Sequence, residues 1–207
     1  MFLIYNKFFF FKNEIFLLIK MGLKHTKTKI VGICGISRAG KTTLRYALLD
    51  YIEKKYKKKY KIEHFSIDEY YVTPLYVYDN NLKQTIIDDE EPEGYAFNEF
   101  IERLKNIRDN NTCDICIVEG FLLYTYQDVE KMIDFKYFLD VDKEICFDRR
   151  KKTKTYYSDY YLEEYIWKGF FRHNVFLDNC THINTNGNLK EIEKVFIEDV
   201  SKKLGLK

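Results

Sequence analysis

The sequence predicts one α/β domain built on a mainly parallel β-sheet of about five strands, with helices on both faces. The first observation is that short apolar runs of strand length alternate with segments whose apolar residues recur at helical spacing, the pattern of parallel strands joined by helices. The second is size and composition. A chain of 207 residues, 46% hydrophobic and 32% charged, suits a single domain with a packed core and is not typical of disorder.

Apolar runs mark the expected strands, and helical periodicity marks the segments between them. The expected strands are residues 29–34, 61–67, 114–119, 135–141 and 181–184. The third of these, DICIVE, is the kind of continuous apolar run that is buried on both faces of a sheet. The expected helices carry Leu44–Ile52, start at Pro92 and carry Phe97–Leu104, include Cys146–Arg150, lie around 162–176, and close the chain over 189–204. Residues 72–91 are expected to be irregular.

The charge balance argues against a nucleic-acid-binding protein. Lys and Arg together number 34 against 32 Asp and Glu, which leaves little net charge for a phosphate backbone. The lysine-rich run 54–61 suits the negative end of a helix dipole, and a nucleic-acid patch is its less favoured interpretation. The sequence therefore predicts no nucleic-acid partner.

Five cysteines, an odd number in a chain with a full core, indicate a reducing compartment and predict a cytoplasmic location. Cys113 and Cys116 have no second Cys/His pair at zinc spacing, and they alternate along an apolar run. We interpret them as buried strand thiols.

The first twenty residues are apolar but are interrupted by Lys7, Lys12 and Glu14. An uninterrupted stretch of ~18 apolar residues is missing, and so is a small-residue cleavage site. The sequence thus predicts neither a membrane span nor a signal peptide. We expect a domain over 21–207, with 1–20 either preceding a true start at Met21 or forming a loosely attached extra helix.

The strongest local motif is Gly35-Ile-Ser-Arg-Ala-Gly40-Lys41-Thr42, which satisfies G-x4-G-K-S/T between a predicted strand and a predicted helix. The glycines let the backbone N–H groups turn toward a phosphate, the lysine reaches the terminal phosphates, and the threonine hydroxyl can ligate Mg²⁺. A glycine turn that only joins two elements is the simpler alternative. The predicted nucleotide-binding residues in this loop are Gly35, Ser37, Arg38, Ala39, Gly40, Lys41, Thr42 and Thr43.

A phosphate loop is compatible with a small-molecule kinase, a switch GTPase or an ATPase motor. The guanine-reading Asn-Lys-x-Asp motif is absent and the chain is short for a motor domain. A phosphotransferase that uses ATP and Mg²⁺ on a small acceptor is therefore favoured, and a nucleotide-binding regulator without turnover is the alternative from another class.

Two carboxylates follow strands of the predicted sheet. Asp68 comes just after the second strand, and Glu119 ends the third. Parallel strands bring such positions to one edge of the sheet, beside the phosphate loop. Either acid alone is more often a capping or surface group, but together with the loop they predict a catalytic base and a metal-side carboxylate.

Basic residues follow the fourth strand, where a closing lid would need them. Arg149, Arg150, Lys151 and Lys152, with Lys154, could form an ordinary solvated run. A lid that clamps phosphates and excludes water is the interpretation we favour.

With these motifs in place, residues ~29–200 resemble the uridine-kinase-like P-loop kinases, and within them the nicotinamide riboside kinases. The most specific stretch is VEGFLLYTY (118–126), and the spacing of the later residues is also similar. Those later residues are Cys146, Arg149, Arg150, Tyr156, Asp159, Tyr161 and Trp167.

The resemblance implies a role for each candidate residue. Asp68 would take the proton of the acceptor 5′-hydroxyl, Lys41 would hold the phosphates, and Thr42, Glu119 and Asp68 would serve Mg²⁺. Outside the loop, the resemblance implies that Arg149 contacts the nucleotide, Arg150 the ribose hydroxyls and Tyr156 the base, with Asp159 nearby. Tyr71 and Glu90 are further candidate substrate-binding residues.

One segment departs from the family pattern. Where the family shows an aromatic residue followed by Asp, DDEEPEGY (88–95) offers Asp89 and Glu90. Glu90 can still bind ribose hydroxyls, and Tyr95 or another tyrosine would have to supply the missing ring. The acidic surroundings would also favour a cationic pyridinium over neutral uracil by simple attraction, unless nearby lysines cancel it. The resemblance implies nicotinamide riboside as acceptor, with uridine, cytidine or another nucleoside as the alternative.

Overall fold

The computed structural model describes residues 27–206 except 58, 154–157, 176 and 178. The predicted extension 1–20, Lys154 and Tyr156 lie outside these residues. Within the described part of the chain, no helix is long and apolar enough to cross a bilayer.

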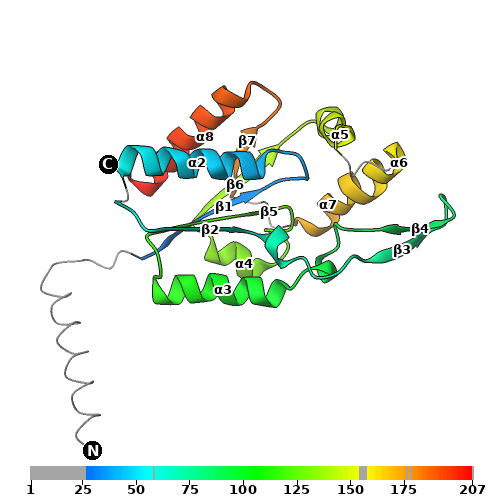
Figure 1. The fold of residues 1–207 in the computed structure, drawn as a ribbon, viewed down its shortest axis with the longest axis horizontal. Coiled ribbons are helices and arrows are strands. Elements are labelled where there is room, and N and C mark those ends of the chain that lie inside the picture. The colour runs from blue at the N-terminus through cyan, green and yellow to red at the C-terminus, as the bar shows by residue number, and fades with distance from the viewer. Residues whose placement is uncertain (1–26, 58, 154–157, 176, 178, 207) are drawn as a thin grey trace, which may run out of the picture.

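A five-stranded parallel sheet forms the centre of the molecule (Figure 1). Its strand order is β2-β5-β1-β6-β7, and every neighbouring pair is parallel. The strands are β1 (Lys29–Cys34), β2 (Ile62–Ser66), β5 (Ile115–Gly120), β6 (Phe135–Asp140) and β7 (Thr181–Asn184). The predicted fold class is confirmed.

Helices cover both faces of this sheet. Figure 1 shows α2 (Lys41–Tyr56) and α8 (Leu189–Leu204) on one face, and α3 (Phe97–Asn110) and α4 (Gln127–Met132) on the other. All six residues of β5 are buried because both of its faces are covered. The continuous apolar run that predicted this strand therefore reflects its central place.

The segment 72–91, which the sequence predicts to be irregular, contains an antiparallel hairpin of β3 (Tyr76–Asp79) and β4 (Gln84–Ile87). Both strands have only four residues and most of their side chains are exposed, so they lack the buried alternation that identifies a strand. The carboxylate of Asp79 closes the turn by accepting the N–H groups of Asn81 and Leu82 at 2.8 and 2.7 Å.

Pro92 starts a short 3₁₀ turn (Pro92–Gly94), and α3 starts later, at Phe97. The helical segment expected around 162–176 is present in three parts and ends at His173. These parts are α6 (Asp159–Tyr161), a π-helical segment (Leu162–Trp167) and α7 (Lys168–His173). Together with α5 (Lys143–Lys151) and the hairpin, they lie at one end of the sheet (Figure 1).

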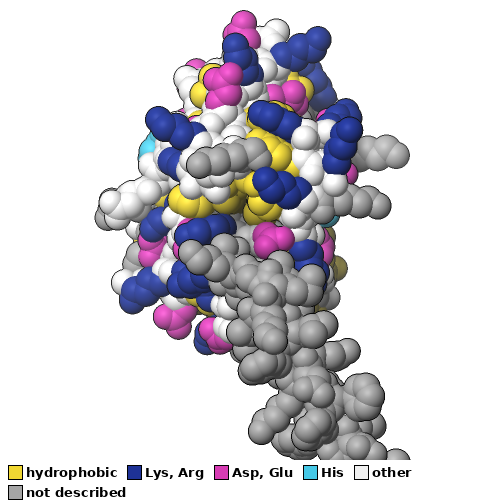
Figure 2. Space-filling model, turned by 90° about the vertical axis from the view of Figure 1, so that its left-hand side faces the viewer, with side chains coloured by type: hydrophobic (Ala, Val, Ile, Leu, Met, Phe, Trp, Pro, Cys, Tyr) yellow, Lys and Arg dark blue, Asp and Glu magenta, His cyan; other side chains and the backbone are white. Residues whose placement is uncertain are grey.

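The lysine-rich end of α2 lies at the surface at the other end of the molecule. Lys54 pairs with Asp50 at 2.8 Å, and the Nζ of Lys55 donates to the Tyr51 hydroxyl at 2.7 Å. Figure 2 shows this end, where Lys and Arg side chains alternate with acidic and hydrophobic ones. The charge of the run is therefore partly offset by its neighbours.

The five cysteines are free, and Cys34, Cys113, Cys116 and Cys146 are buried. Both predicted strand thiols are buried, but only Cys116 lies within β5, because the strand starts at Ile115, two residues after Cys113.

Candidate active site at the carboxyl edge of the sheet

The phosphate loop joins the end of β1 to the start of α2. Gly40 caps the helix with a φ of 102°, a conformation that glycine adopts without strain. A Cβ built on Gly40 would meet nothing within 4 Å. Glycine therefore suits this position because of the backbone conformation and not because a side chain would clash. The first N–H groups of α2 are left without acceptors in the helix and face the loop's concave side.

Lys41 lies folded over this loop. Its side chain is buried, and Nζ donates to the carbonyl oxygens of Gly35 and Ile36 at 2.9 and 3.2 Å. The ammonium group is thereby held at the wall of a large cavity, where it can meet a phosphate.

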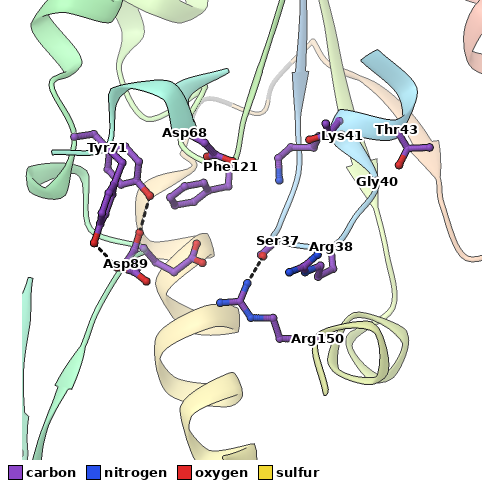
Figure 3. Close-up of a pocket in the computed structure, with 13 residues that line it drawn as sticks. Ser37, Arg38, Gly40, Lys41, Thr43, Asp68, Tyr71, Asp89, Phe121 and Arg150 are labelled. Carbon is purple, nitrogen blue, oxygen red and sulfur yellow. Dashed lines mark hydrogen bonds between the residues drawn. The ribbon is translucent and has the colours of Figure 1, made fainter. Parts of the chain in front are cut away.

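That cavity, of about 630 Å³, combines the loop with segments distant in sequence (Figure 3). It is lined by Ser37, Arg38, Gly40, Lys41, Thr42, Thr43, Asp68, Tyr71, Asp89, Glu90, Tyr95, Phe121 and Arg150. Most of the predicted site residues therefore meet in one place. The predicted residues that do not line it are Gly35, Ala39, Glu119, Arg149 and Asp159.

Asp68 reaches the cavity from a 3₁₀ turn (Ile67–Tyr70) that directly follows β2. A capping box fixes this turn: the Ser66 hydroxyl accepts the Asp68 N–H at 3.1 Å, and the Glu69 carboxylate accepts the Ser66 N–H at 2.9 Å. Ser66 lies opposite Glu119 in the sheet register. The two predicted acids thus emerge at the same edge.

Glu119 is buried behind the start of α2. It accepts the Thr42 hydroxyl at 2.9 Å, and its second oxygen, Oε2, has no hydrogen-bond partner among the described residues. Burial raises the pKa of Glu119, while Lys41, the Thr42 hydrogen bond and Arg45 act in the opposite direction.

Thr42 and Glu119 offer oxygen atoms of the kind that Mg²⁺ prefers. In the part of the chain that the structure describes, three or more His, Cys, Asp or Glu side chains do not cluster as a metal site. Mg²⁺ at nucleotide sites typically takes one or two carboxylates, waters and the phosphates themselves. A hydroxyl and an unpartnered carboxylate oxygen beside the phosphate loop fit that donor set.

Glu90 forms the acidic wall of the cavity. It is buried, its Oε2 has no hydrogen-bond partner among the described residues, and burial raises its pKa to about 8 against the attraction of Lys41 and Arg150. Gly169 of α7 makes room for it, because a Cβ there would lie 3.3 Å from the Glu90 Cβ.

Three aromatic rings line the same side of the cavity. Tyr95 lies between Tyr71 and Phe121, with ring centroids 5.3 and 5.6 Å away. The Tyr71 hydroxyl donates to the Asp89 carboxylate at 3.0 Å, and the Tyr95 hydroxyl to the Asp89 carbonyl at 3.2 Å (Figure 3). Sequence reasoning missed Phe121 as a site residue, although it lies in the stretch VEGFLLYTY, two residues after Glu119.

The two arginines of α5 face different cavities. Arg150 donates to the Ser37 hydroxyl at 2.7 Å and lines the large cavity. Arg149 donates to the carbonyls of Arg38 and Thr185, and it lines a smaller cavity of about 250 Å³. The other residues of the smaller cavity are Ala39, Gly40, Thr43, Leu44, Thr185, Gly187, Leu189 and Ile192.

Sequence reasoning missed the part of this smaller cavity that follows β7, and the Asn186-Gly187 turn is the signal that could have found it.

Asp159 lies farther out, where its carboxylate pairs with Lys151 at 2.6 Å.

The parallel sheet and the loop between β1 and α2 are similar in arrangement to those of P-loop kinases. Among solved structures, shikimate kinase from Bacteroides thetaiotaomicron matches with a TM-score of 0.54 and 16% sequence identity, covering 86% of this chain and 99% of that one. This likeness concerns the fold.

Two curated proteins extend the similarity to sequence. The uridine kinase of Borrelia garinii subsp. bavariensis is 28% identical over 174 residues, 70% of this chain and 79% of that protein. Nicotinamide riboside kinase 1 of Rattus norvegicus is 24% identical over 168 residues, 75% of this chain and 83% of that protein. No family model matches the chain. These similarities support the predicted resemblance to uridine-kinase-like P-loop kinases.

The raised pKa of Glu90 predicts a pH-dependent stability. Between its ordinary pKa of 4.5 and its folded pKa of about 8, the folded protein keeps a proton that the unfolded chain releases, so stability falls as pH rises. Glu90→Gln has no such proton. The melting temperature of Glu90→Gln minus that of wild type should therefore increase by a few °C between pH 5 and pH 8, as measured by thermal unfolding.

The matched control is Glu93→Gln, at a nearby exposed carboxylate. The difference in melting temperature between this variant and wild type should change little from pH 5 to pH 8. A constant difference for Glu90→Gln would contradict the prediction.

Proposed function

We propose that the protein transfers the γ-phosphoryl group of ATP to the 5′-hydroxyl of a ribonucleoside, and that nicotinamide riboside is its preferred acceptor. The observation that carries this proposal is the cavity, in which the phosphate loop forms one wall and Asp68, Glu90 and aromatic rings form the other. Donor phosphates and an acceptor hydroxyl could therefore be brought together within one cavity.

On the donor side, the loop N–H groups and Lys41 bind the β- and γ-phosphates. Thr42 and Glu119, with Asp68 on the acceptor side, would hold Mg²⁺ directly or through water. The metal, when bound, neutralises charge on the transferred phosphoryl group. The smaller cavity beside Arg149 is placed to take the base of the nucleotide, because it lies on the outer side of the same loop.

On the acceptor side, Asp68 orients the 5′-hydroxyl and accepts its proton. Glu90 has a carboxylate oxygen without a hydrogen-bond partner in the described part of the chain, which could bind the ribose hydroxyls, and Arg150 approaches the cavity from α5. Closure of the segment that carries α5–α7 would exclude water and protect ATP from hydrolysis. Asp159 and Tyr156, the latter outside the described residues, are proposed to join the acceptor side in that closure.

The acceptor wall supports a cationic base. Asp89 and Glu90 line it, and Tyr71, Tyr95 and Phe121 offer ring surface, which attracts cations as well as flat bases. Because the pKa of Glu90 is raised to about 8, Glu90 is mostly protonated at neutral pH, and Asp89 is the acid that would attract a cation. A pyridinium would gain from Asp89 and from the rings, whereas a neutral uracil would gain from the rings alone. The similarity to uridine kinases supports the alternative, a pyrimidine nucleoside kinase.

An acceptor panel tests the substrate. With ATP and Mg²⁺, we expect the highest kcat/KM for nicotinamide riboside and lower values for uridine and cytidine. The full chain and a chain starting at Met21 should give the same order, because the cavity residues all follow Met21. A clear preference for uridine or cytidine would replace the proposed acceptor with a pyrimidine nucleoside.

Replacement of Asp68 tests the chemistry. Asp68→Asn should lower kcat by about 10²–10⁴-fold, the usual contribution of a general base, and leave ATP binding intact because the phosphate loop is unchanged. Turnover assays and ATP titration measure the two effects. Asp109→Asn, an exposed carboxylate on α3, is the control. Unchanged turnover in Asp68→Asn would refute the role of Asp68 as base.

Asp89 tests the preference for positive charge. Asp89→Asn keeps the shape of the side chain and removes its charge, so kcat/KM should fall about tenfold for cationic nicotinamide riboside relative to its neutral dihydro form, the equivalent of ~1.4 kcal/mol. Steady-state kinetics on the two acceptors measure this ratio. An equal loss on both would show that Asp89 does not read charge.

A further inference from the structure

Arg45 is a buried arginine without a part in the proposed reaction. It lies on α2 one turn after Thr42, its side chain is 6% exposed, and it does not line the large cavity. Its Nε and Nη1 atoms have no hydrogen-bond acceptor among the described residues. Burial of a guanidinium is costly unless nearby charges compensate it, so the neighbours of Arg45 explain its presence.

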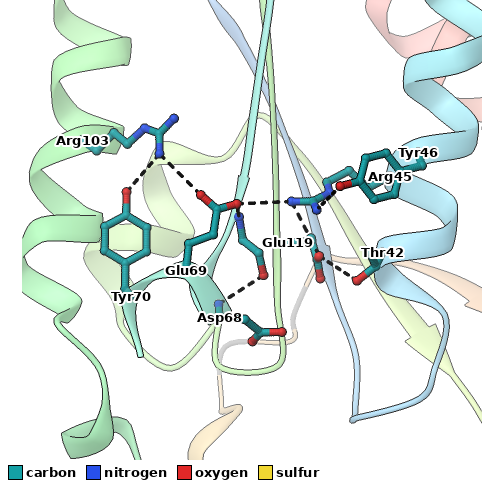
Figure 4. Close-up of polar contacts among 9 residues, drawn as sticks. Thr42, Arg45, Tyr46, Asp68, Glu69, Tyr70, Arg103 and Glu119 are labelled. Carbon is teal, nitrogen blue, oxygen red and sulfur yellow. Dashed lines mark hydrogen bonds and ion pairs between the residues drawn. The ribbon is translucent and has the colours of Figure 1, made fainter. Parts of the chain in front are cut away.

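Two carboxylates flank this guanidinium (Figure 4). Nη1 lies 3.7 Å from Oε1 of Glu119 and 3.8 Å from Oε1 of Glu69. These separations are those of ion pairs and exceed hydrogen-bond lengths. Because Glu119 is the second-last residue of β5 and Glu69 lies in the turn after β2, one cation on α2 bridges acids at two neighbouring strand ends.

Each of these acids holds a group of the proposed reaction. Glu119 accepts the Thr42 hydroxyl, and these two side chains offer the oxygen atoms that suit Mg²⁺. Glu69 accepts the Ser66 N–H and so completes the capping box that fixes the turn of Asp68. Arg45 therefore contacts both the donor side and the base-bearing turn without touching the cavity.

A second arginine holds the other oxygen of Glu69. Nη1 of Arg103 lies 3.9 Å from Oε2, and Arg103 also donates to the Tyr70 hydroxyl and lies 4.0 Å over the Phe65 ring. The Arg103 side chain is 40% exposed and the Arg45 side chain 6%. Because Glu69 is itself 51% exposed, water screens both pairs, and Arg45 is the partner that is fixed by burial.

We propose that Arg45 is a positioning residue for phosphoryl transfer. It ties the phosphate-loop helix to Glu119 and to the turn of Asp68, so that Glu119, on the metal side, and Asp68, the base, keep a fixed position relative to each other. The proposal rests on the phosphotransfer chemistry proposed above and is independent of which nucleoside is the acceptor. A lysine at this position would keep the charge but not the fork that reaches two acids.

The first test separates catalysis from nucleotide binding. With ATP, Mg²⁺ and whichever of nicotinamide riboside and uridine is turned over faster, Arg45→Met should lower kcat about a hundredfold, the scale of a ~1 Å misplacement. KM for ATP should change less than about threefold, because the loop itself is intact. Arg45→Lys should recover part of kcat.

The matched control is Arg108→Met. Arg108 pairs with Asp134 at 2.6 Å, each side chain is 18% exposed, and the pair lies at the amino edge of the sheet, away from the site. This variant should lower the melting temperature and leave kcat unchanged. If Arg45→Met loses kcat only in proportion to a comparable loss of stability, the role is merely structural and the proposal fails.

A double-mutant cycle tests the route through Glu69. Glu69→Gln keeps an oxygen for the Ser66 N–H and removes the charge that Arg45 meets. The loss of kcat in the double variant should therefore be smaller than the product of the losses in Arg45→Met and Glu69→Gln, because both substitutions break the same contact. If Arg45→Met does not fold, Arg45→Lys with Glu69→Gln gives the same cycle. Independent, multiplying effects would overturn the proposal.

Hydrogen exchange gives a readout without turnover. Arg45→Met should speed amide exchange in the turn Ile67–Tyr70, whereas Arg108→Met should not. Unchanged exchange in that turn would overturn the proposal even if kcat falls. If wild-type protein turned over neither nucleoside, the proposed function would fail, and the exchange result would still decide whether Arg45 orders the turn.

Discussion

The parallel pairing of β5 with β1 and β2 is the constraint on which the candidate site depends. It places Cys34 opposite Gly120, and Ser66 opposite Glu119. Since parallel strands end at the same edge, the placement of the phosphate loop, Glu119 and the turn of Asp68 follows from this register. A shift of one residue in either pairing would turn a strand's side chains to the opposite faces and separate these groups.

Buried ionisable groups are the second organising feature of the site. Lys41, Arg45, Glu90 and Glu119 are all buried, two basic and two acidic side chains, and each acid has basic neighbours. Burial raises the pKa of both acids, and the same low local polarity strengthens attraction between the site and a charged nucleotide. The cost of burying these groups is understandable at a site for highly charged substrates.

The sequence predicted most of the fold because local signals agree with the tertiary structure there. The phosphate loop, the five strands and the acids after β2 and β5 each have a local pattern. The hairpin of β3 and β4 has none, since its short strands are exposed and Asp79 holds its turn by side-chain hydrogen bonds. Phe121 and Arg45 were missed for a related reason: an apolar residue after a strand and a basic residue on a helix are ordinary until their neighbours are known.

By itself, the sequence determined the α/β fold, the nucleotide loop and the candidate acids, because backbone geometry and hydrophobic periodicity are local properties of the chain. Only the tertiary structure decided which residues share a cavity, that Arg149 and Arg150 face different ones, and that Arg45 bridges two acids. These are matters of burial and of distance between segments far apart in sequence. Coulomb interactions depend on that distance and on the surrounding polarity, and neither exists until the chain is folded.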